Sequence, residues 1–95
     1  MKIFYLESAR DDLVWMRHYY EAVFPEDQKN AQKQFHAVER TLRTNPFIGH
    51  TTHRQYVREF TIPKTPFSFI YRIFPDHIEV LRIWDERRDR AKLDE

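Results

Sequence analysis

The sequence predicts a two-layer α+β domain, with an N-terminal strand, an antiparallel helical hairpin and a three-stranded antiparallel meander in one sheet (β-α-α-β-β-β). Three observations predict it. Apolar residues recur at helical spacing in the first half, aromatic and β-branched runs follow in the second, and the links between those runs are short and contain proline. With 95 residues, 16% of them aromatic, the chain suits a single domain over residues 1–95.

The first half is expected to contain a strand and two helices. Residues 2–6 are aromatic and β-branched, which favours a strand. Ser8 with Asp11 forms the Ser-x-x-Asp pattern of a capping box that begins a helix, and Pro25 ends this helix. The second helix is expected to stop before Pro46. The predicted buried faces are Leu13, Met16, Tyr20 and Val23 in the first helix, and Ala31, Phe35, Val38 and Leu42 in the second.

The second half is expected to form the meander. Residues 46–55 are polar and predict a loop, in which Gly49, the only glycine, should occupy a positive-φ turn. Strands are expected at 56–62, 67–74 and 77–84, and their short links require antiparallel neighbours. The charged residues after the last strand alternate in sign and predict a solvated turn or short helix.

Composition limits the classes of function. The net charge is only +1, so a basic binding site must be a local patch. Cysteine is absent, which excludes a disulfide framework and a thiolate metal site. No apolar run approaches the roughly 20 residues of a membrane span, and the N-terminus lacks a signal-peptide pattern. We therefore expect a cytoplasmic protein with no metal, no cofactor and no membrane partner.

Each of the three meander strands carries one arginine: Arg58, Arg72 and Arg82. A permanent charge inside a strand must reach water, a carboxylate or a ligand, so the three together predict an anion-facing surface. Arg58 is expected on the same face as Tyr56 and Phe60. There it is either a charge at the rim of the sheet or a ligand contact, and we favour the ligand contact.

The other two arginines also have structural interpretations. Arg72 is expected to pair with Glu79 across the last hairpin, and we favour that role for it. Arg82 is expected to share a face with Val80 and Trp84. A cation–π contact with Trp84 or a salt bridge is then the alternative to ligand binding.

Several short motifs follow one another at a specific spacing over nearly the whole chain. They are Ser8-Ala9-Arg10-Asp11-Asp12-Leu13, Asn45-Pro46 with Gly49, Arg58-Glu59-Phe60, Thr65-Pro66-Phe67, Tyr71-Arg72, Leu81-Arg82-Ile83-Trp84 and Arg87-Arg88-Asp89. In this order they resemble the ParE/RelE toxin superfamily, and the ending is closer to the ParE-like branch. The resemblance implies a bacterial type II toxin of the plasmid-stabilisation kind, held inactive by a cognate antitoxin in a hetero-oligomer.

The resemblance implies one of two activities. ParE-like members poison DNA gyrase and have no established hydrolytic site, whereas RelE-like members are ribosome-dependent mRNA endoribonucleases. An RNase needs a base for the 2′-OH, a cation for the phosphorane and an acid for the 5′-oxygen. If this chain is a nuclease, the residues expected to take part are Arg58 and Arg82 as cations, with His53 or His50 and Asp85 or Glu59 as acid and base.

Two departures from the RelE-like pattern weaken the nuclease alternative. RelE-like members tend to place a histidine or tyrosine just beyond the last strand, where this chain has Trp84, Asp85 and Glu86. The lysines that such members carry before the first sheet arginine are replaced here by Thr51-Thr52-His53-Arg54.

We therefore predict a gyrase-binding toxin that is not a hydrolase. Interface cores favour tryptophan and arginine, so the predicted partner-contact residues are Arg58, Arg82, Trp84, Arg87 and Arg88. The alternatives are an mRNA endoribonuclease that works on the ribosome, and an inert homologue that only binds a partner.

Overall fold

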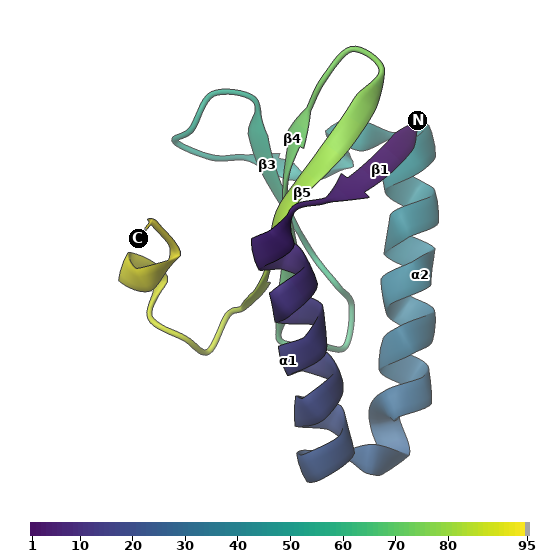
Figure 1. Ribbon diagram of the computed structural model, residues 1–95. Helices are drawn as coiled ribbons and strands as arrows, with labels where there is room; N and C mark the ends of the chain where they lie inside the picture. Colours follow the sequence, from purple (N-terminus) through teal and green to yellow (C-terminus); the bar gives the residue numbers. More distant parts are fainter. Residues whose placement is uncertain (95) are drawn as a thin grey trace.

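Two antiparallel helices cover one face of a five-stranded sheet in the computed structural model, which describes residues 1–94 (Figure 1). The elements are β1 (Lys2–Tyr5), α1 (Glu7–Val23), α2 (Gln28–Thr44), β2 (His50–Thr51), β3 (Val57–Thr61), β4 (Phe67–Ile73) and β5 (His77–Asp85), with short 3-10 turns at Pro25–Asp27, Pro46–Ile48 and Arg90–Asp94. The order of strands in the sheet is β1-β5-β4-β3-β2. The α+β prediction is confirmed. None of the helices within residues 1–94 is long and apolar enough to cross a membrane.

The sheet is mixed rather than wholly antiparallel. β1 runs parallel to β5, with Ile3 opposite Ile78 and Tyr5 opposite Val80. The β3–β4 and β4–β5 pairs are antiparallel as expected, and β2, which falls in the predicted loop, pairs antiparallel with β3. Tight turns set the direction of the meander strands. The direction of β1 relative to β5 depends instead on the long connection through both helices, which the local sequence does not encode.

The core lies between the helices and one face of the sheet. Phe67, Phe69 and Tyr71 of β4 are fully buried against Met16 and Tyr20 of α1. The predicted face of α2 is confirmed, with Ala31, Val38 and Leu42 buried and Phe35 partly buried against them. Val23 was predicted to be buried but is 52% exposed, because it lies in the last turn of α1, outside the contact with the sheet.

The expected capping box at the start of α1 does not form. The helix begins at Glu7, one residue before Ser8, and its N-cap is Leu6, which has no side-chain cap. Leu6 is instead bonded to the sheet, because its N–H donates to the carbonyl oxygen of Val80 in β5 at 3.0 Å. The chain therefore passes from the last hydrogen bond of β1 directly into the helix, with no intervening residue for a polar cap.

Gly49 does not occupy a positive-φ turn, because its φ is −70° and its ψ is 155°. Glycine is required here for a different reason, namely a close approach. A Cβ atom at Gly49 would lie 2.7 Å from the carbonyl oxygen of Glu59 and closer still to the Tyr71 hydroxyl. The positive-φ positions among the described residues are Tyr56 at 66° and Lys64 at 63°. Tyr56 accordingly lies outside the strand in which it was expected.

His77 lies at the end of the sheet where β4 turns into β5. Its ring stacks on Phe74 with 4.5 Å between the ring centroids, and its Nδ1 atom lies 2.7 Å from the Asp76 carboxylate. Its Nε2 atom lies 3.5 Å from the Glu79 carboxylate. The hydrogen bond to Asp76 raises the pKa of His77 above the ordinary 6.5, desolvation opposes this rise, and Glu79 adds to it.

We expect the stability contribution of His77 to depend on pH. A folded-state pKa above the unfolded value of 6.5 means that the protonated ring favours the folded state below that value. The contribution is then lost as the pH rises through the folded-state pKa. The difference in Tm between wild type and His77→Gln, measured by circular dichroism, should be larger near pH 6 than near pH 9. A difference that is constant over this range would contradict the assignment.

Candidate functional site

The three strand arginines do not converge on one anion-facing surface. Arg58 points to the helix-side loop, Arg72 lies on the opposite face of the sheet, and Arg82 turns towards α1. The expectation of a shared surface is wrong, because Arg58 lies on the helix side of the sheet whereas Arg72 and Arg82 lie on the opposite face, where Asp12 draws Arg82 to the edge. Their individual contacts show what each one does.

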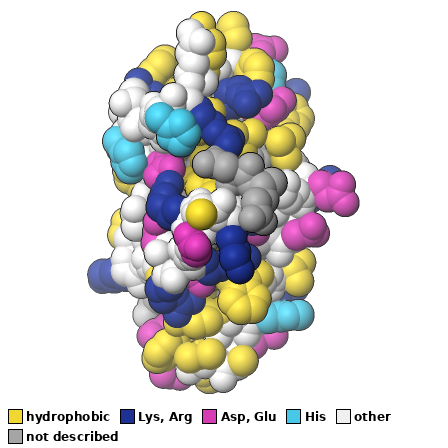
Figure 2. Space-filling model, turned by 90° about the vertical axis from the view of Figure 1, so that its left-hand side faces the viewer, with side chains coloured by type: hydrophobic (Ala, Val, Ile, Leu, Met, Phe, Trp, Pro, Cys, Tyr) yellow, Lys and Arg dark blue, Asp and Glu magenta, His cyan; other side chains and the backbone are white. Residues whose placement is uncertain are grey.

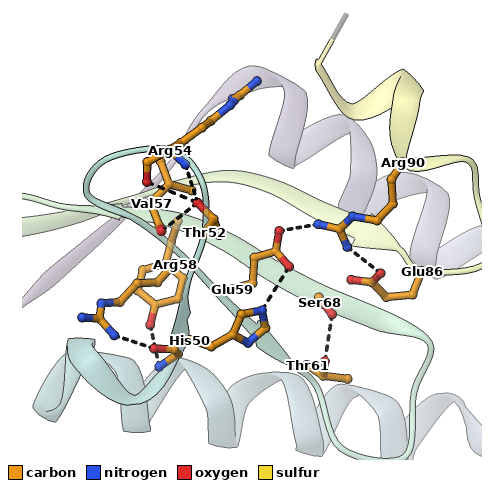
Figure 3. Close-up of polar contacts among 12 residues, drawn as sticks. His50, Thr52, Arg54, Val57, Arg58, Glu59, Thr61, Ser68, Glu86 and Arg90 are labelled. Atoms are coloured by element: carbon orange, nitrogen blue, oxygen red, sulfur yellow. Dashed lines mark hydrogen bonds and ion pairs between the residues drawn. The ribbon is translucent and has the colours of Figure 1, made fainter.

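Arg58 ties the loop before β2 to β3. One terminal nitrogen of its guanidinium donates to the carbonyl oxygens of Gly49 at 2.7 Å and Phe47 at 3.2 Å (Figure 3). Its central carbon lies 5.2 Å from the centroid of the Phe47 ring. Tyr71 holds the same loop, because its hydroxyl accepts from the Gly49 N–H at 3.0 Å and donates to the Pro46 carbonyl at 2.7 Å. The loop beside β3 is therefore fixed on both sides.

Arg82 forms a bidentate pair with Asp12 of α1. Its Nε and one terminal nitrogen donate to the two carboxylate oxygens at 2.8 and 3.0 Å. The same carboxylate accepts from the Ile83 N–H at 3.0 Å, at the edge of β5 beyond the end of β1. Asp12 thus takes the place that a longer β1 would occupy. The hydrogen bond to Asp12 raises the pKa of Arg82, although desolvation opposes the rise.

A β-bulge at Leu81 decides which way Arg82 faces. The register moves from Val80 opposite Tyr71 to Arg82 opposite Ile70, so that Leu81 is an additional residue. Val80 consequently packs in the helix-side core, whereas Arg82 stacks on Trp84 with 5.1 Å between its guanidinium carbon and the ring centroid. The prediction that Arg82 and Val80 share a face is wrong for this reason, while the expected cation–π contact is present.

Arg72 lies opposite Glu79 in the register of β4 and β5, as expected. Among the residues that the structure describes, however, the two side chains form no ion pair. Glu79 pairs instead with His77, its neighbour on the same face of β5. The predicted role of Arg72 as the partner of Glu79 is therefore corrected.

The face of the sheet away from the helices, called the open face below, carries a second apolar cluster. Val57, Ile70 and Trp84 are buried there, and Leu93 of the C-terminal segment packs against them. Basic and acidic side chains lie side by side on the side of the molecule where this segment runs (Figure 2). Trp84 is only 1% exposed, so its side chain is not accessible to a partner in this arrangement.

Glu59 links the open face to the C-terminal segment. Its carboxylate lies 3.4 Å from Nε2 of His50 on β2 and also pairs with Arg90, which bonds in turn to Glu86 at 2.8 Å (Figure 3). A cleft of about 340 Å³ lies beside Glu59 and Arg90 and is also lined by His53. The structure therefore brings together His50 and Glu59, two residues considered as an acid–base pair, and leaves His53 in the cleft wall.

Asp85 lies on the other side of the sheet and is not part of this cleft. It is 3% exposed, and its carboxylate accepts hydrogen bonds from Nε of Arg87 at 2.9 Å and from a terminal nitrogen of Arg87 at 2.7 Å. Burial alone would raise the pKa of Asp85, but the hydrogen bonds and charge of Arg87 hold this pKa below its ordinary value. Asp85 is therefore ionised at neutral pH and carries no proton to donate to a leaving group.

The two neighbouring arginines each contact an aromatic ring. The guanidinium of Arg87 lies 4.2 Å from the Tyr19 ring centroid and donates to the Tyr19 hydroxyl at 2.8 Å. Arg88 lies 5.0 Å from the Trp84 ring centroid. Both arginines are exposed, so of the five predicted partner-contact residues these two are the most accessible.

Sequence reasoning missed Asp12, Tyr19 and Arg90. A signal for Asp12 was present, because it lies between Ala9 and Met16 at helical spacing, on the face that α1 buries. An acidic residue at such a position requires a cation or several donors. Tyr19 and Arg90 carried no comparable signal, since neither interrupts a pattern.

Comparisons with known proteins agree with this geometry. A family model described as the ParE toxin of the type II toxin–antitoxin system parDE matches residues 3–90. A chain from the chromosomal ParDE toxin–antitoxin system of P. aeruginosa is similar at 27% identity and a TM-score of 0.70, over 87% of this chain and 92% of that one.

A more distant similarity extends to the fold alone. The YoeB dimer from Staphylococcus aureus matches at 12% identity and a TM-score of 0.61, over 87% of this chain and 93% of that one. No curated protein sequence matches significantly. Because the family model covers nearly all of the described residues, the chain belongs to the ParE toxin family of type II toxin–antitoxin systems.

Proposed function

We propose that this toxin acts by binding DNA gyrase and that a cognate antitoxin neutralises it by binding the toxin. The match to the ParE family supports the ParE-like branch over the RelE-like branch. The observation that carries the mechanism is that two of the charged groups nominated for hydrolysis, Arg82 and Asp85, are held in salt bridges within the fold. Arg82 is bound to Asp12, and Asp85 is ionised and bound to Arg87. Charged side chains that are held in salt bridges suit the recognition of a protein better than acid–base chemistry.

The antitoxin is proposed to bind the accessible residues at the start of the C-terminal segment. Arg87 and Arg88 keep the partner-contact role predicted for them, because both are exposed beside aromatic rings. Arginine and aromatic side chains are the residue types that dominate interface energetics. Arg82 and Trp84 remain in the proposal only as supports for this surface, because both Arg82 and Arg88 stack on the Trp84 ring. Arg58 holds the loop before β2 instead.

The gyrase proposal predicts a result in a purified system. Supercoiling of relaxed plasmid by DNA gyrase should fall as the toxin is added, because a bound toxin interferes with strand passage. Toxin mixed beforehand with the antitoxin encoded beside it is the matched control and should leave supercoiling intact. Supercoiling that is unchanged by a molar excess of folded toxin would contradict the proposal.

A second candidate function is an mRNA endoribonuclease, and one observation favours it. His50 and Glu59 lie 3.4 Å apart with Arg90 beside them, which supplies an acid–base pair and a cation next to a cleft. Its test is cleavage of mRNA on programmed ribosomes. Cleavage that is lost in His50→Ala but retained in His18→Ala, an exposed histidine on α1, would establish this function in place of gyrase binding.

A further inference from the structure

We propose that Arg88 is the residue through which the toxin recognises a carboxylate of its antitoxin, and that the Trp84 ring positions Arg88 for this contact. The inference rests on the proposed function, because it takes the antitoxin as the partner that binds the start of the C-terminal segment. It goes further by naming one of the two exposed arginines there, the chemical group that this arginine binds and the ring that orients it.

The two exposed arginines differ in how their charges are balanced. Arg87 donates to both carboxylate oxygens of Asp85 and also to the Tyr19 hydroxyl. Arg88 forms no ion pair with any residue that the structure describes, and its guanidinium lies against the Trp84 ring instead. A guanidinium carries five N–H donors in a planar fork that matches a carboxylate. Arg88 therefore has its charge and its donors available to a partner, whereas Arg87 is already paired.

Arg88 is exposed, yet its position is fixed from two sides. Its backbone N–H donates to the Asp85 carbonyl oxygen at 2.9 Å, which closes a turn just after β5. Its guanidinium carbon lies 5.0 Å from the centroid of the buried Trp84 ring. A cation at this distance from an aromatic face is attracted by the ring quadrupole. An arginine that is oriented before binding loses less side-chain entropy on binding than a freely rotating one.

Packing and charge, rather than a hydrogen bond, position the Trp84 ring itself. Its Nε1 atom is buried and finds no acceptor among residues 1–94. The ring packs in the apolar cluster of the open face, and the guanidinium carbon of Arg82 lies 5.1 Å from its centroid. Because Asp12 pairs with Arg82, a carboxylate offsets the charge of one of the two guanidinium groups at this ring. Arg88 therefore shares the ring without an unbalanced like charge beside it.

The charges around Arg88 favour a single carboxylate of a protein over a nucleic acid. Asp85, Glu86 and Asp89 are its near neighbours in the chain. A phosphate backbone would bring many negative charges against these carboxylates, and tight binding of nucleic acid typically involves roughly six to ten phosphate contacts. One carboxylate bound by the fork of one guanidinium needs no wider basic surface.

The antitoxin is the protein partner that such a contact suits. An antitoxin has to hold the toxin in a complex tight enough to keep it inactive. A bidentate arginine–carboxylate pair at a pre-oriented position contributes both affinity and geometric specificity. Arg88 also follows Arg87 directly, on the surface that the proposed function gives to the antitoxin.

The first test compares Arg88→Gln with Lys92→Gln, by calorimetry of each toxin with the antitoxin encoded beside it. Each variant removes one positive charge from an exposed position of the C-terminal segment, so both should fold like wild type. Arg88→Gln should raise the Kd about tenfold or more, and Lys92→Gln should change it less than about twofold. Equal losses in the two variants, or an unchanged Kd for Arg88→Gln, would contradict the inference.

Two further variants test the chemistry of the contact. Arg88→Lys keeps the charge but loses the fork, so its Kd should rise by about threefold or more, and full affinity would contradict a bidentate contact. Arg88→Glu should bind very weakly to the natural antitoxin. Among antitoxin variants in which each Asp or Glu is replaced by Arg in turn, one should restore binding to Arg88→Glu. Failure of every such variant would show that the group bound by Arg88 is not a carboxylate.

A double-mutant cycle tests the positioning role of Trp84. Trp84→Leu removes the ring and should raise the Kd about fivefold, whereas Trp84→Phe keeps an aromatic face and should stay closer to wild type. Added to Arg88→Gln, Trp84→Leu should weaken binding little further, because the ring acts through Arg88. Additive losses would contradict the positioning role. Should Trp84→Leu not fold, the NMR shifts of wild type decide. The ring current should move the side-chain protons of Arg88 upfield, and random-coil shifts would contradict the stacking.

The gyrase assay separates this inference from the rest of the proposed function. Arg88→Gln should inhibit supercoiling as wild type does, and weaker inhibition together with full antitoxin binding would assign Arg88 to the target and overturn the inference. If wild type binds the antitoxin without inhibiting gyrase, the gyrase proposal fails alone and the Kd of Arg88→Gln still decides the inference. If wild type does not bind the antitoxin, the inference fails with the antitoxin proposal. Tight binding of fluorescein-labelled oligouridine that is lost in Arg88→Gln would put a nucleic acid in place of the carboxylate and overturn it.

Discussion

Asp12→Ala is expected to destabilise the protein by about 2–4 kcal/mol. The Asp12 carboxylate accepts two hydrogen bonds from Arg82 and one from the Ile83 N–H. Its removal leaves a partly buried guanidinium without its counter-charge and a backbone donor without an acceptor. The side chains of Asp12 and Arg82 are 9% and 23% exposed, so water replaces these contacts only in part. The free energy of unfolding, measured in urea, gives the loss directly.

Asp11→Ala is the matched control for this prediction. It removes the same charge one residue earlier, at an exposed position of α1, and should change the stability by about 0.5 kcal/mol or less. In the double variant Asp12→Ala/Arg82→Ala the cost should be well below the sum of the single costs, because the second substitution removes the unpaired cation. A loss below about 1 kcal/mol for Asp12→Ala would show that the pair contributes little.

Gly49→Ala is expected to cost about 3 kcal/mol through overpacking. The backbone of Gly49 at φ −70° suits alanine, so the entire cost is steric. The added methyl group would meet the Glu59 carbonyl oxygen at 2.7 Å and would displace the buried Tyr71 hydroxyl. The hydroxyl would then lose its hydrogen bonds to the Gly49 N–H and the Pro46 carbonyl. Urea unfolding again measures the effect.

A double-mutant cycle with Tyr71→Phe tests the cause. Tyr71→Phe alone should cost about 1–3 kcal/mol, because it leaves two buried backbone groups unpaired. Combined with Gly49→Ala it should cost less than the sum, since the displaced hydroxyl is already absent. Strict additivity would mean that the methyl group clashes only with the strand backbone. A stability equal to wild type for Gly49→Ala would contradict the close approach itself.

Most of the fold follows from patterns that the sequence carries locally. Helical spacing marked the buried residues of α2, and aromatic runs between prolines marked the three meander strands. Three features did not follow, each for a physical reason. β2 is only two residues long, which is too short to show the alternation of apolar and polar residues that marks a strand. The direction of β1 depends on a crossover through both helices. The bulge at Leu81 appears only in the register of β4 and β5.

The candidate site was less predictable than the fold, because its contacts are long-range. Arg82 meets Asp12 across 70 positions of sequence, and Arg90 meets Glu59 across 31. Local sequence identifies a charged side chain but does not identify its partner. The alternating charges after β5 predicted a solvated segment, yet Leu93 packs against the open face and Arg90 pairs with Glu59. A lone leucine in a charged tail was the available signal for that contact.

The strand arginines therefore hold the fold together more than they form a shared surface. Arg58 fixes the loop before β2, and Arg82 joins β5 to α1. Arg87 and Arg88 lie exposed beside such a support, since Arg88 stacks on the same Trp84 ring as Arg82, and they are the residues that we propose contact the antitoxin.

The most direct measurement is a side-by-side assay of one toxin preparation on DNA gyrase and on ribosomes programmed with mRNA. A toxin that works by binding gyrase should abolish supercoiling and leave the mRNA intact. Cleaved mRNA together with undiminished supercoiling would contradict the proposal that this protein binds its target rather than hydrolysing it.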